Sequence, residues 1–354
     1  MEQQLTSPHP DPSKIMQVGM GFWASKALLA AVKFNLFTIL CGKSKPAREI
    51  KDQLHLGTTD RHVYDWLDVL VSLGFLEREG LLDNARYSNS ADTETFLDAN
   101  KPSYIGGILQ MANNRLYKHW SNLEEGLLTG EPQNETRDGS NMNFFNDLYQ
   151  SPEKLHEFVN AMSGIQGGNF MALAKKFDFS KYTSMADIGG ADGFLSCIIA
   201  LQHPSLTFIS YDMPQVEPLA RAKIAGFNLT DRVQAASGDF LKDPFPSAEI
   251  ITMGNILHGI NEESKLAMIR KVYDALPENG VFIVIENIID NERNKNTFGL
   301  LMSLNMLIEN GDAFDFTLND FESWTREAGF KKTELIPLAG PTSAAIAYKN
   351  YSPE

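Results

Sequence analysis

Residues 185–213 constrain the fold of this chain more than any other stretch. An apolar run is followed by a glycine turn, an apolar segment of helical length and a further apolar run. This order predicts a strand that ends at Asp187, a turn at Gly189–Gly190, a helix over Phe194–Gln202 and a strand over Thr207–Tyr211. Two parallel strands joined by a helix form a βαβ unit, whose ligand-binding crevice lies at the carboxyl ends of the strands. We therefore expect an α/β fold with a ligand beside this turn.

The residues of the turn narrow the class of ligand. A dinucleotide-binding turn has the pattern Gly-x-Gly-x-x-Gly, but from Gly189 onward the next two glycine positions hold Ala191 and Phe194. Asp192 in the turn would repel phosphate groups and would suit a positively charged ligand. Asp212, after the second strand, could accept hydrogen bonds from both hydroxyls of a ribose. A phosphate-free nucleoside with a cationic tail describes S-adenosylmethionine; an ordinary α/β turn is the alternative.

Length, charge and cysteine content bound the remaining possibilities. The chain has 354 residues, enough for two domains, and its formal net charge of −14 works against nonspecific binding to nucleic acid or anionic membranes. Cys41 and Cys197 are the only cysteines, so neither a disulfide framework nor a cysteine-rich zinc site is expected. The first residues do not resemble a signal peptide, and no apolar run approaches the roughly 18 residues that span a bilayer. We expect a cytoplasmic protein with neither a nucleic-acid nor a membrane partner.

The segment Pro12–Leu40 carries apolar residues at helical spacing on more than one face. A helix with so much apolar surface near a terminus needs a partner besides its own domain. A subunit interface is the favoured partner, and burial within one monomer is the alternative.

Residues 44–90 resemble a winged helix. The sequence predicts a helix over Ala47–Leu54, a second helix over Asp60–Leu73 with Thr59 as its N-cap, and a two-stranded wing around Gly80. The second helix begins Asp-Arg-His-Val-Tyr-Asp-Trp-Leu-Asp, with three aspartates and one arginine, which is a poor composition for neutralising DNA phosphates. We therefore expect a structural module and not a DNA-binding one.

The rest of the chain alternates between predicted strands and helices. Gly164, Gly167 and Gly168 are expected to break a helical run and to mark the domain boundary, with a separate helix over Asn169–Phe177. Beyond the first βαβ unit the predicted elements are helices over Pro214–Gly226, Glu262–Ala275, Thr297–Asn310 and Leu318–Ala328, strands over Val233–Ala236, Ile250–Met253 and Val281–Ile285, and a closing hairpin of Lys332–Leu338 and Ser343–Lys349.

Several short motifs together resemble one known family. They are Asp187-x-Gly-Gly-x-x-Gly, Asp212-Met-Pro-x-Val, Asp231-Arg-Val, Gly238-Asp-Phe240, Asn255-Ile-Leu-His258 and Val284-x-Glu286, together with Gly21-Phe-Trp-x-Ser-Lys-Ala-Leu28. This set resembles the small-molecule O-methyltransferases that use S-adenosylmethionine and carry an N-terminal dimerisation domain. The stretch Leu301-Met-Ser-Leu-Asn-Met-Leu307 is particularly similar to the hydroxyindole (acetylserotonin) O-methyltransferase branch.

The resemblance implies an architecture and a partner. It implies a mainly helical, winged-helix dimerisation domain over residues 1–165, followed by a Rossmann-like class I methyltransferase domain over residues 166–354. The second domain would contain a seven-stranded, mostly parallel sheet with one antiparallel edge strand. The protein would be an interleaved homodimer that acts on a small molecule in secondary metabolism and releases S-adenosylhomocysteine.

The resemblance also assigns residues to the cofactor. It implies contacts from Asp187, Gly189, Gly190, Asp212, Met213, Asp239, Phe240 and Asn255. In this arrangement Asp212 holds the ribose and Asp239 accepts a hydrogen bond from the adenine amino group. Met213 and Phe240 pack on the adenine ring.

The chemistry requires alignment of the acceptor oxygen, the methyl group and the sulfur, and removal of a proton. His258 follows the fourth strand and matches the catalytic histidine of the family, Glu286 matches the carboxylate that orients it, and Asp315 matches a third carboxylate, with Asp312 as a competitor. The family usually has His-Asp-Trp where this chain has His258-Gly259-Ile260, which could widen the pocket or weaken base catalysis. No metal is expected, on the ground that no ligand cluster accompanies His258.

The acceptor site is expected between two helices. Its expected lining is Phe158, Met162, Met302, Asn305, Met306 and Glu309, with plain core packing as the alternative for the methionines. A flat aromatic acceptor with a phenolic or enolic hydroxyl fits best. Transfer to carbon or nitrogen, a non-methylating enzyme that retains the cofactor, and a winged-helix regulator that senses S-adenosylmethionine are the competing hypotheses.

Overall fold

A computed structural model describes residues 10–137 and 148–350. By its internal contacts the chain forms two compact units, Met1–Arg115 and Leu116–Glu354. Residues 116–165, which the sequence analysis assigned to the N-terminal domain, group with the second unit. The long helix α11 (Pro152–Lys176) runs through the division expected at residue 165.

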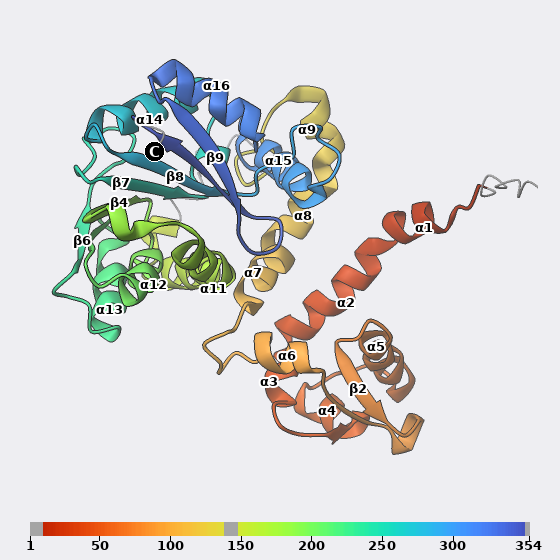
Figure 1. Cartoon of the computed structure of the whole chain (residues 1–354). Coiled ribbons are helices and arrows are strands. Elements are labelled where there is room, and N and C mark those ends of the chain that lie inside the picture. The colour runs from red at the N-terminus through yellow and green to blue at the C-terminus, as the bar shows by residue number, and fades with distance from the viewer. Residues whose placement is uncertain (1–9, 138–147, 351–354) are drawn as a thin grey trace, which may run out of the picture. The chain divides into compact units, whose positions relative to one another are not determined.

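The first unit is built from helices around a small antiparallel sheet (Figure 1). Its elements are α1 (Ser13–Gly19), α2 (Gly21–Lys33), α3 (Leu36–Ile39), β1 (Lys45–Pro46), α4 (Ala47–Gln53), α5 (Asp60–Ser72), β2 (Leu76–Glu79), η1 (Leu82–Asn84), β3 (Arg86–Asn89), α6 (Ala91–Phe96) and α7 (Gly106–Met111), with η2 (Ala112–Leu116) at the division. The winged-helix fold is confirmed. Thr59 caps α5 by accepting a hydrogen bond from the backbone N–H of His62. The sheet has three strands, because the two-residue strand β1, too short to leave a periodic signal, pairs with β3.

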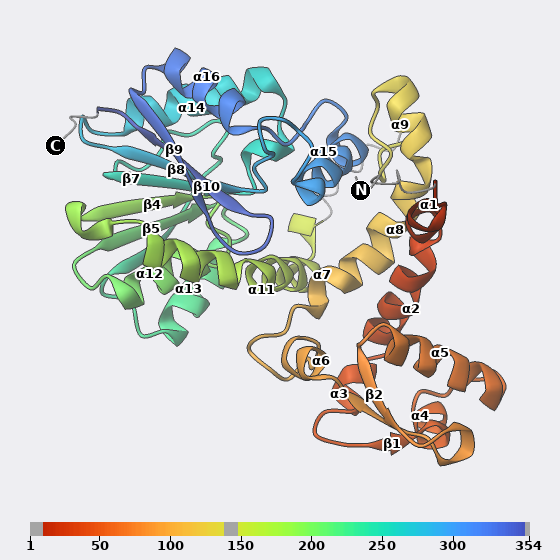
Figure 2. The same cartoon turned by 45° about the vertical axis from the view of Figure 1, so that its right-hand side comes forward.

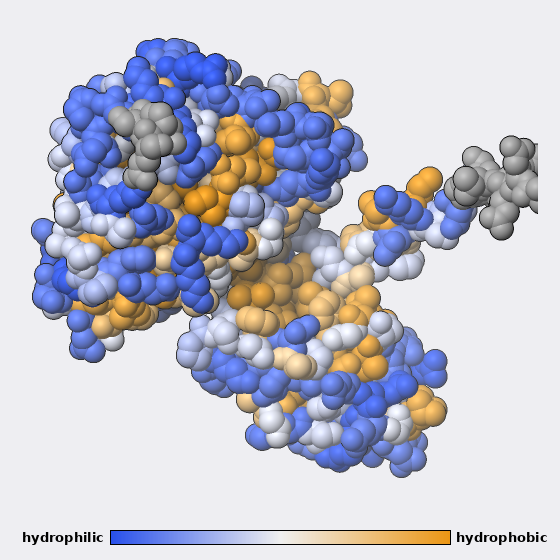
Figure 3. Space-filling view, viewed as in Figure 1, coloured by the Kyte–Doolittle hydropathy of each residue, from blue (hydrophilic) through white to orange (hydrophobic). Residues whose placement is uncertain are grey.

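The N-terminal segment forms three helices and not one. Asn35 has a φ of +55° and interrupts the helical backbone between α2 and α3. A bend of 41° separates α1 from α2. Ile15 is 74% exposed and Trp23 is 62% exposed, and apolar residues lie on the surface of this segment in Figure 3. Within the described residues, no single helix is long and apolar enough to cross a membrane, and α1 with α2 meets that criterion only as a bent pair.

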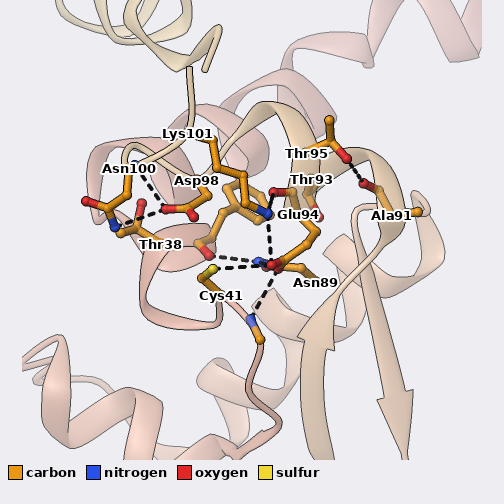
Figure 4. Close-up of polar contacts among 12 residues, drawn as sticks. Thr38, Cys41, Asn89, Ala91, Thr93, Glu94, Thr95, Asp98, Asn100 and Lys101 are labelled. Carbon is orange, nitrogen blue, oxygen red and sulfur yellow. Dashed lines mark hydrogen bonds and ion pairs between the residues drawn. The ribbon is translucent and has the colours of Figure 1, made fainter. Parts of the chain in front are cut away.

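The carboxylate of Glu94 on α6 is a polar hub of the first unit (Figure 4). It accepts hydrogen bonds from Asn89 Nδ2 at 2.7 Å, from the Gly42 backbone N–H at 3.4 Å and from the Cys41 thiol at 3.2 Å, and it pairs with Lys101 Nζ at 3.0 Å. Its hydrogen bond from Asn89 is the main cause that lowers the pKa of Glu94 to about 2. This hub ties the chain after α3 to α6.

The second unit contains a large sheet with helices on both faces. Its elements are α8 (Tyr117–His119), η3 (Trp120–Asn122), α9 (Leu123–Thr129), α11 (Pro152–Lys176), η4 (Phe179–Lys181), β4 (Ser184–Ile188), α12 (Phe194–Gln202), β5 (Thr207–Asp212), α13 (Glu217–Gly226), β6 (Val233–Ser237), β7 (Ile250–Gly254), η5 (Leu257–Gly259), α14 (Glu262–Ala275), β8 (Val281–Glu286), α15 (Thr297–Asn310), α16 (Leu318–Ala328), β9 (Lys332–Pro337) and β10 (Ser343–Tyr348). The predicted bounds of α12, α14, α15 and α16 are confirmed.

The seven strands lie in the order β6-β5-β4-β7-β8-β10-β9. The pairs from β6 to β8 are parallel, and β10 is antiparallel to both β8 and β9. The expected seven-stranded, mostly parallel sheet is therefore confirmed, but the antiparallel strand is not at the edge. The hairpin places β9 outside β10, so the edge strand β9 runs in the same direction as β8.

Helices lie on both faces of the sheet (Figures 1 and 2), and a hydrophobic core fills the space on each face. Leu173 of α11 with residues of α12 and α13 covers one face, while α14 and α16 cover the other. The chain order reverses at β4, whose neighbours are β5 on one side and β7 on the other. Such a switch point opens a crevice at the carboxyl ends of the strands.

The glycines expected to break α11 lie inside it. Gly164, Gly167 and Gly168 are all helical. A glycine costs a helix only about 1 kcal/mol relative to alanine, so packing can outweigh it. At Gly167 an added Cβ would lie 3.4 Å from the Phe194 ring, so α11 packs directly against α12 at this glycine.

Candidate active site

The turn after β4 requires glycine at two positions. Gly189 has a φ of +72°, and a Cβ there would lie 2.5 Å from Ile256 Cδ1. A Cβ on Gly190 would lie 2.5 Å from Ser210 Oγ. The N–H of Gly189 donates to the Tyr211 carbonyl at 2.8 Å, which fixes the turn against β5.

Asp212 is held at the end of β5 by the same turn. Its Oδ2 accepts from the Ala191 N–H at 2.8 Å and its Oδ1 accepts from the Met213 N–H at 2.7 Å. Burial raises the pKa of Asp212, and these two hydrogen bonds oppose that effect. The carboxylate is therefore fixed beside Gly189–Gly190, as the sequence predicts.

The other two aspartates of this strand and turn, Asp187 and Asp192, bind partners inside the protein. Asp187 accepts a hydrogen bond from Thr252 Oγ1 at 2.7 Å, which joins β4 to β7, and burial raises the pKa of Asp187 to about 7. Asp192 pairs with Lys223 Nζ at 2.8 Å and accepts from Ser163 Oγ at 2.7 Å. The expectation that Asp192 offers its charge to a cationic ligand is therefore wrong, because Lys223 already neutralises it.

The predicted adenine side lies at the ends of β5 and β6. Asp239 pairs with Lys242 at 2.7 Å, and the hydrogen bond from Lys242 is the main cause that lowers the pKa of Asp239. Phe240 packs at the edge of the core under α14, and Met213 packs at the edge of a small cluster around Leu155. Asn255 follows β7 in the left-handed region, with a φ of +53°.

Sequence reasoning missed Tyr149 at this site. Burial, together with the nearby carboxylates of Asp212 and Asp239, raises the pKa of Tyr149 to about 12. A single tyrosine at this position carries no pattern that would single it out.

His258, Glu286 and Asp315 meet at the carboxyl end of the sheet. Nδ1 of His258 on η5 lies 3.4 Å from Asp315 Oδ1 and 3.7 Å from Glu286 Oε2. Glu286, at the end of β8, is 1% exposed, and Asp315, between α15 and α16, is 2% exposed. Of the two aspartates left open by the sequence, Asp315 lies beside His258, whereas Asp312 accepts a hydrogen bond from Asn261 Nδ2 at 2.9 Å.

The electrostatics of this cluster favour a protonated imidazole. Burial alone lowers the pKa of His258, but Glu286 and Asp315 together outweigh it and raise the pKa above the ordinary value for histidine. Burial raises the pKa of Glu286, and the nearby imidazole opposes that effect. Nδ1 faces the two carboxylates, so Nε2 is the ring nitrogen left for a ligand.

The argument from sequence that His258 lacks a ligand cluster is wrong. One ligand atom from each of His258, Glu286 and Asp315 lies within 4.8 Å of the others, a spacing that could also hold a cation. A metal ion does not fit this site well, because the buried ammonium of Lys265 already acts on both carboxylates. The three residues therefore form an imidazole with two carboxylate partners.

The predicted acceptor residues lie on two helices. Phe158 and Met162 lie on α11, and Phe158 packs in the same cluster as Met213, toward the cofactor side. The predicted residues of α15 are Met302, Asn305, Met306 and Glu309. Met306 is buried, which favours core packing for it. Trp120, which sequence reasoning missed, donates to Asn305 Oδ1.

Comparison with known proteins agrees with this arrangement. Residues 16–99 match the O-methyltransferase dimerisation domain, and residues 120–331 match the O-methyltransferase domain. The chain belongs to this O-methyltransferase family. The family uses S-adenosylmethionine. This result confirms the family resemblance predicted from the motifs, and it also confirms the predicted enzyme class and cofactor.

Relatives cover nearly the whole chain. It is 36% identical to the tetracenomycin polyketide synthesis 8-O-methyl transferase TcmO of Streptomyces glaucescens, over 96% of this chain and 97% of that protein. It is 29% identical to the N,N-dimethyltransferase OxyT of Streptomyces rimosus, over 92% of each. The structure of human N-acetylserotonin methyltransferase with S-adenosylmethionine matches with a TM-score of 0.87 and 22% identity, over 98% of this chain and 100% of that one, and so supports the fold.

Proposed function

We propose that this protein transfers the methyl group of S-adenosylmethionine to a hydroxyl of a small aromatic metabolite, with His258 as the general base. The observation that carries the proposal is the place of His258. It lies with Glu286 and Asp315 at the same edge of the sheet as the turn at Gly189 and the fixed carboxylate of Asp212.

The cofactor would lie along the carboxyl ends of β4, β5 and β6. Bound S-adenosylmethionine supplies a methyl group activated by a positively charged sulfur. Gly189 and Gly190 would admit the methionine part, Asp212 would hold the ribose, and Asp239, Met213, Phe240 and Asn255 would surround the adenine. Tyr149 lies near Asp212 and Asp239 and would cover this part of the site. Asp187 would act indirectly, by holding β4 against β7.

His258 would receive the proton of the acceptor. The acceptor oxygen forms a bond to the methyl carbon as the carbon–sulfur bond breaks, and the hydroxyl proton passes to Nε2. Glu286 and Asp315 would fix the ring and stabilise the imidazolium that forms. The base must be neutral at the start, so His258 has to lose its own proton to solvent first. The relative TcmO, whose name describes an 8-O-methyl transferase, supports a hydroxyl as the acceptor.

Phe158 and Met162 of α11 and Met302, Asn305 and Glu309 of α15 would line the acceptor site, with Met306 behind them. Met side chains adapt to irregular apolar shapes, which suits a flat aromatic ligand. We further propose that the N-terminal part of the chain, up to residue 165, forms a homodimer through the exposed apolar residues of α1 and α2. Light scattering would test this, because Trp23→Glu should yield monomers.

Transfer to nitrogen is the second candidate. It is favoured by the name of the relative OxyT, an N,N-dimethyltransferase, and by His258-Gly259-Ile260 in place of the usual His-Asp-Trp. An amine acceptor that is already neutral does not need a base of the same strength.

One experiment separates these possibilities. Calorimetry with S-adenosylmethionine would first establish binding, and incubation with phenols, hydroxyindoles, quinols and aryl amines would follow, with mass spectrometry for a gain of one methyl group. In His258→Ala, turnover of a phenol should fall by about 10²–10⁴-fold while cofactor affinity stays nearly unchanged. Undiminished turnover of the phenol would exclude His258 as the base.

A further inference from the structure

Lys265 is fully buried on α14, seven residues after His258. Its exposure is 0%, although lysine is almost never fully buried without a partner. Its Nζ donates to the carbonyl of Ile260 and lies 3.7 Å from the centroid of the Phe314 ring, a cation–π distance. These contacts hold the ammonium between the loop that carries His258 and the loop that carries Asp315.

The charged groups around Lys265 come from β8, α14, η5 and the loop before α16. Glu286 of β8, Asp315 and Asp312 of the loop before α16, and Glu262 of α14 attract it, while the imidazole of His258 on η5 repels it. Two of these carboxylates have other partners. Glu262 accepts from Trp324 Nε1 at 3.0 Å, and Asp312 accepts from Asn261.

Glu286 and Asp315 are the carboxylates that need compensation. Among the described residues, no hydrogen bond is formed to Glu286 Oε2 or to either carboxylate oxygen of Asp315, although His258 Nδ1 lies 3.4 Å from Asp315 Oδ1. Buried carboxylates without a counter-charge are costly, so a cation must stand near them. If His258 were the only one, it would stay protonated, and a protonated imidazole has no lone pair with which to accept a proton.

We propose that Lys265 is a positioning residue for His258, whose ammonium balances the Glu286 and Asp315 carboxylates so that the imidazole can exist in its neutral form. The inference rests on the proposed role of His258 as a base. In this arrangement both cations offset the two carboxylates, and His258 also gains and loses the proton of the acceptor. Burial lowers the pKa of Lys265 to about 8, and against the effect of burial the two carboxylates raise the pKa of His258 to about 9, so the two groups titrate in overlapping pH ranges.

The test is a direct titration of His258 that needs no acceptor. Histidine labelled with ¹³C at Cε1 is followed by NMR against pH in the full-length protein, and the His258 signal is the one lost in His258→Asn. Lys265→Gln keeps a donor for the Ile260 carbonyl but removes the charge, and Lys265→Met removes both. Lys349→Met is the matched control, because Lys349 is also buried, donates to the carbonyls of Tyr273 and Leu276, and lies over the Tyr273 ring, but at the far end of α14.

We expect the titration midpoint of His258 to rise by about half a pH unit or more in both Lys265 variants and to stay unchanged in Lys349→Met. An unchanged or lowered midpoint in folded Lys265→Gln would overturn the inference. Circular dichroism establishes folding. If neither Lys265 variant folds, ¹⁵Nζ-lysine NMR of the native protein decides instead. The His258 signal should then respond in the pH range where Lys265 titrates, and independence of the two signals would contradict the inference.

The outcome is separable from that of the proposed function. If no acceptor is methylated but the His258 midpoint moves, the charge balance holds and the reaction assignment fails. If His258→Ala abolishes turnover but the midpoint does not move, His258 remains the base and Lys265 has no part in it.

Discussion

The indole N–H of Trp120 donates a 2.8 Å hydrogen bond to Oδ1 of Asn305. Because an indole can only donate, this contact also fixes which end of the Asn305 amide faces Trp120. The Nδ2 group is left as the polar end, with Met302 Sδ at 4.0 Å. Asn305 is therefore oriented as a hydrogen-bond donor, which suits a carbonyl or phenolate oxygen on the acceptor.

Replacing Trp120 with Phe should weaken acceptor recognition selectively. The amide of Asn305 would lose its fixed orientation, and losing one hydrogen bond to a half-buried polar group costs about 1–3 kcal/mol. We expect kcat/KM for the acceptor to fall by about 5–100-fold, mainly through KM, with unchanged affinity for S-adenosylhomocysteine. Trp66→Phe is the matched control, since Trp66 donates in the same way to the Ala27 carbonyl in the first unit. An equal loss in both variants would contradict the assignment.

The pH dependence of turnover should report the cluster around His258. The carboxylates of Glu286 and Asp315 raise the pKa of His258, so the neutral form needed for proton abstraction appears only at higher pH. We expect kcat/KM to rise with pH through a midpoint above about 6.5, the ordinary value for histidine. Glu286→Gln removes one negative charge and should move this midpoint downward, while lowering the maximal rate. A midpoint that is the same in Glu286→Gln would show that another group controls the rate.

Much of the second unit could be predicted from the sequence because its signals are local. The helix starts at Asn261 and Thr317 are set by capping side chains that bond to backbone N–H groups within three residues. The positions of Gly189 and Asp212 follow from a single βαβ unit. His258 and Glu286 follow two neighbouring strands, so the parallel sheet necessarily brings them to one edge.

What the sequence did not reveal depends on contacts between distant segments. Lys265 has the polar character of an ordinary surface position, and only the meeting of α14 with the loop at Phe314 buries it. Trp120 lies 185 positions before Asn305. The prediction that Asp192 offers its charge to a ligand was wrong for the same reason, because its neutralising partner Lys223 lies on α13.

Gly189→Ala should disrupt the cofactor turn. Alanine is strained at a φ of +72°, and its Cβ would lie 2.5 Å from Ile256. We expect loss of measurable binding of S-adenosylhomocysteine by calorimetry and a lower Tm. Gly226→Ala is the matched control, because an added Cβ at the end of α13 has nothing within 4 Å. It should bind normally and be as stable as the native protein or more so. Normal binding by Gly189→Ala would mean that the ligand does not approach this turn.

Glu94→Ala should destabilise the first unit without touching the chemistry. The substitution leaves the ammonium of Lys101, the amide of Asn89 and the Gly42 N–H without their shared acceptor. We expect the Tm at pH 7 to fall by several degrees, while affinity for S-adenosylhomocysteine is unchanged.

The pKa of Glu94 is lowered from 4.5 to about 2, mainly by the hydrogen bond from Asn89, so the contribution of Glu94 to stability is present above pH 4.5 and is lost as the pH falls toward 2. The difference in Tm between native protein and variant should therefore narrow on acidification. Glu49→Ala, which removes an exposed carboxylate paired with Lys45 on the same unit, should change Tm little at any pH. A constant gap between native protein and Glu94→Ala from pH 7 to pH 3 would show that the Glu94 charge is not what holds α6 to the chain after α3.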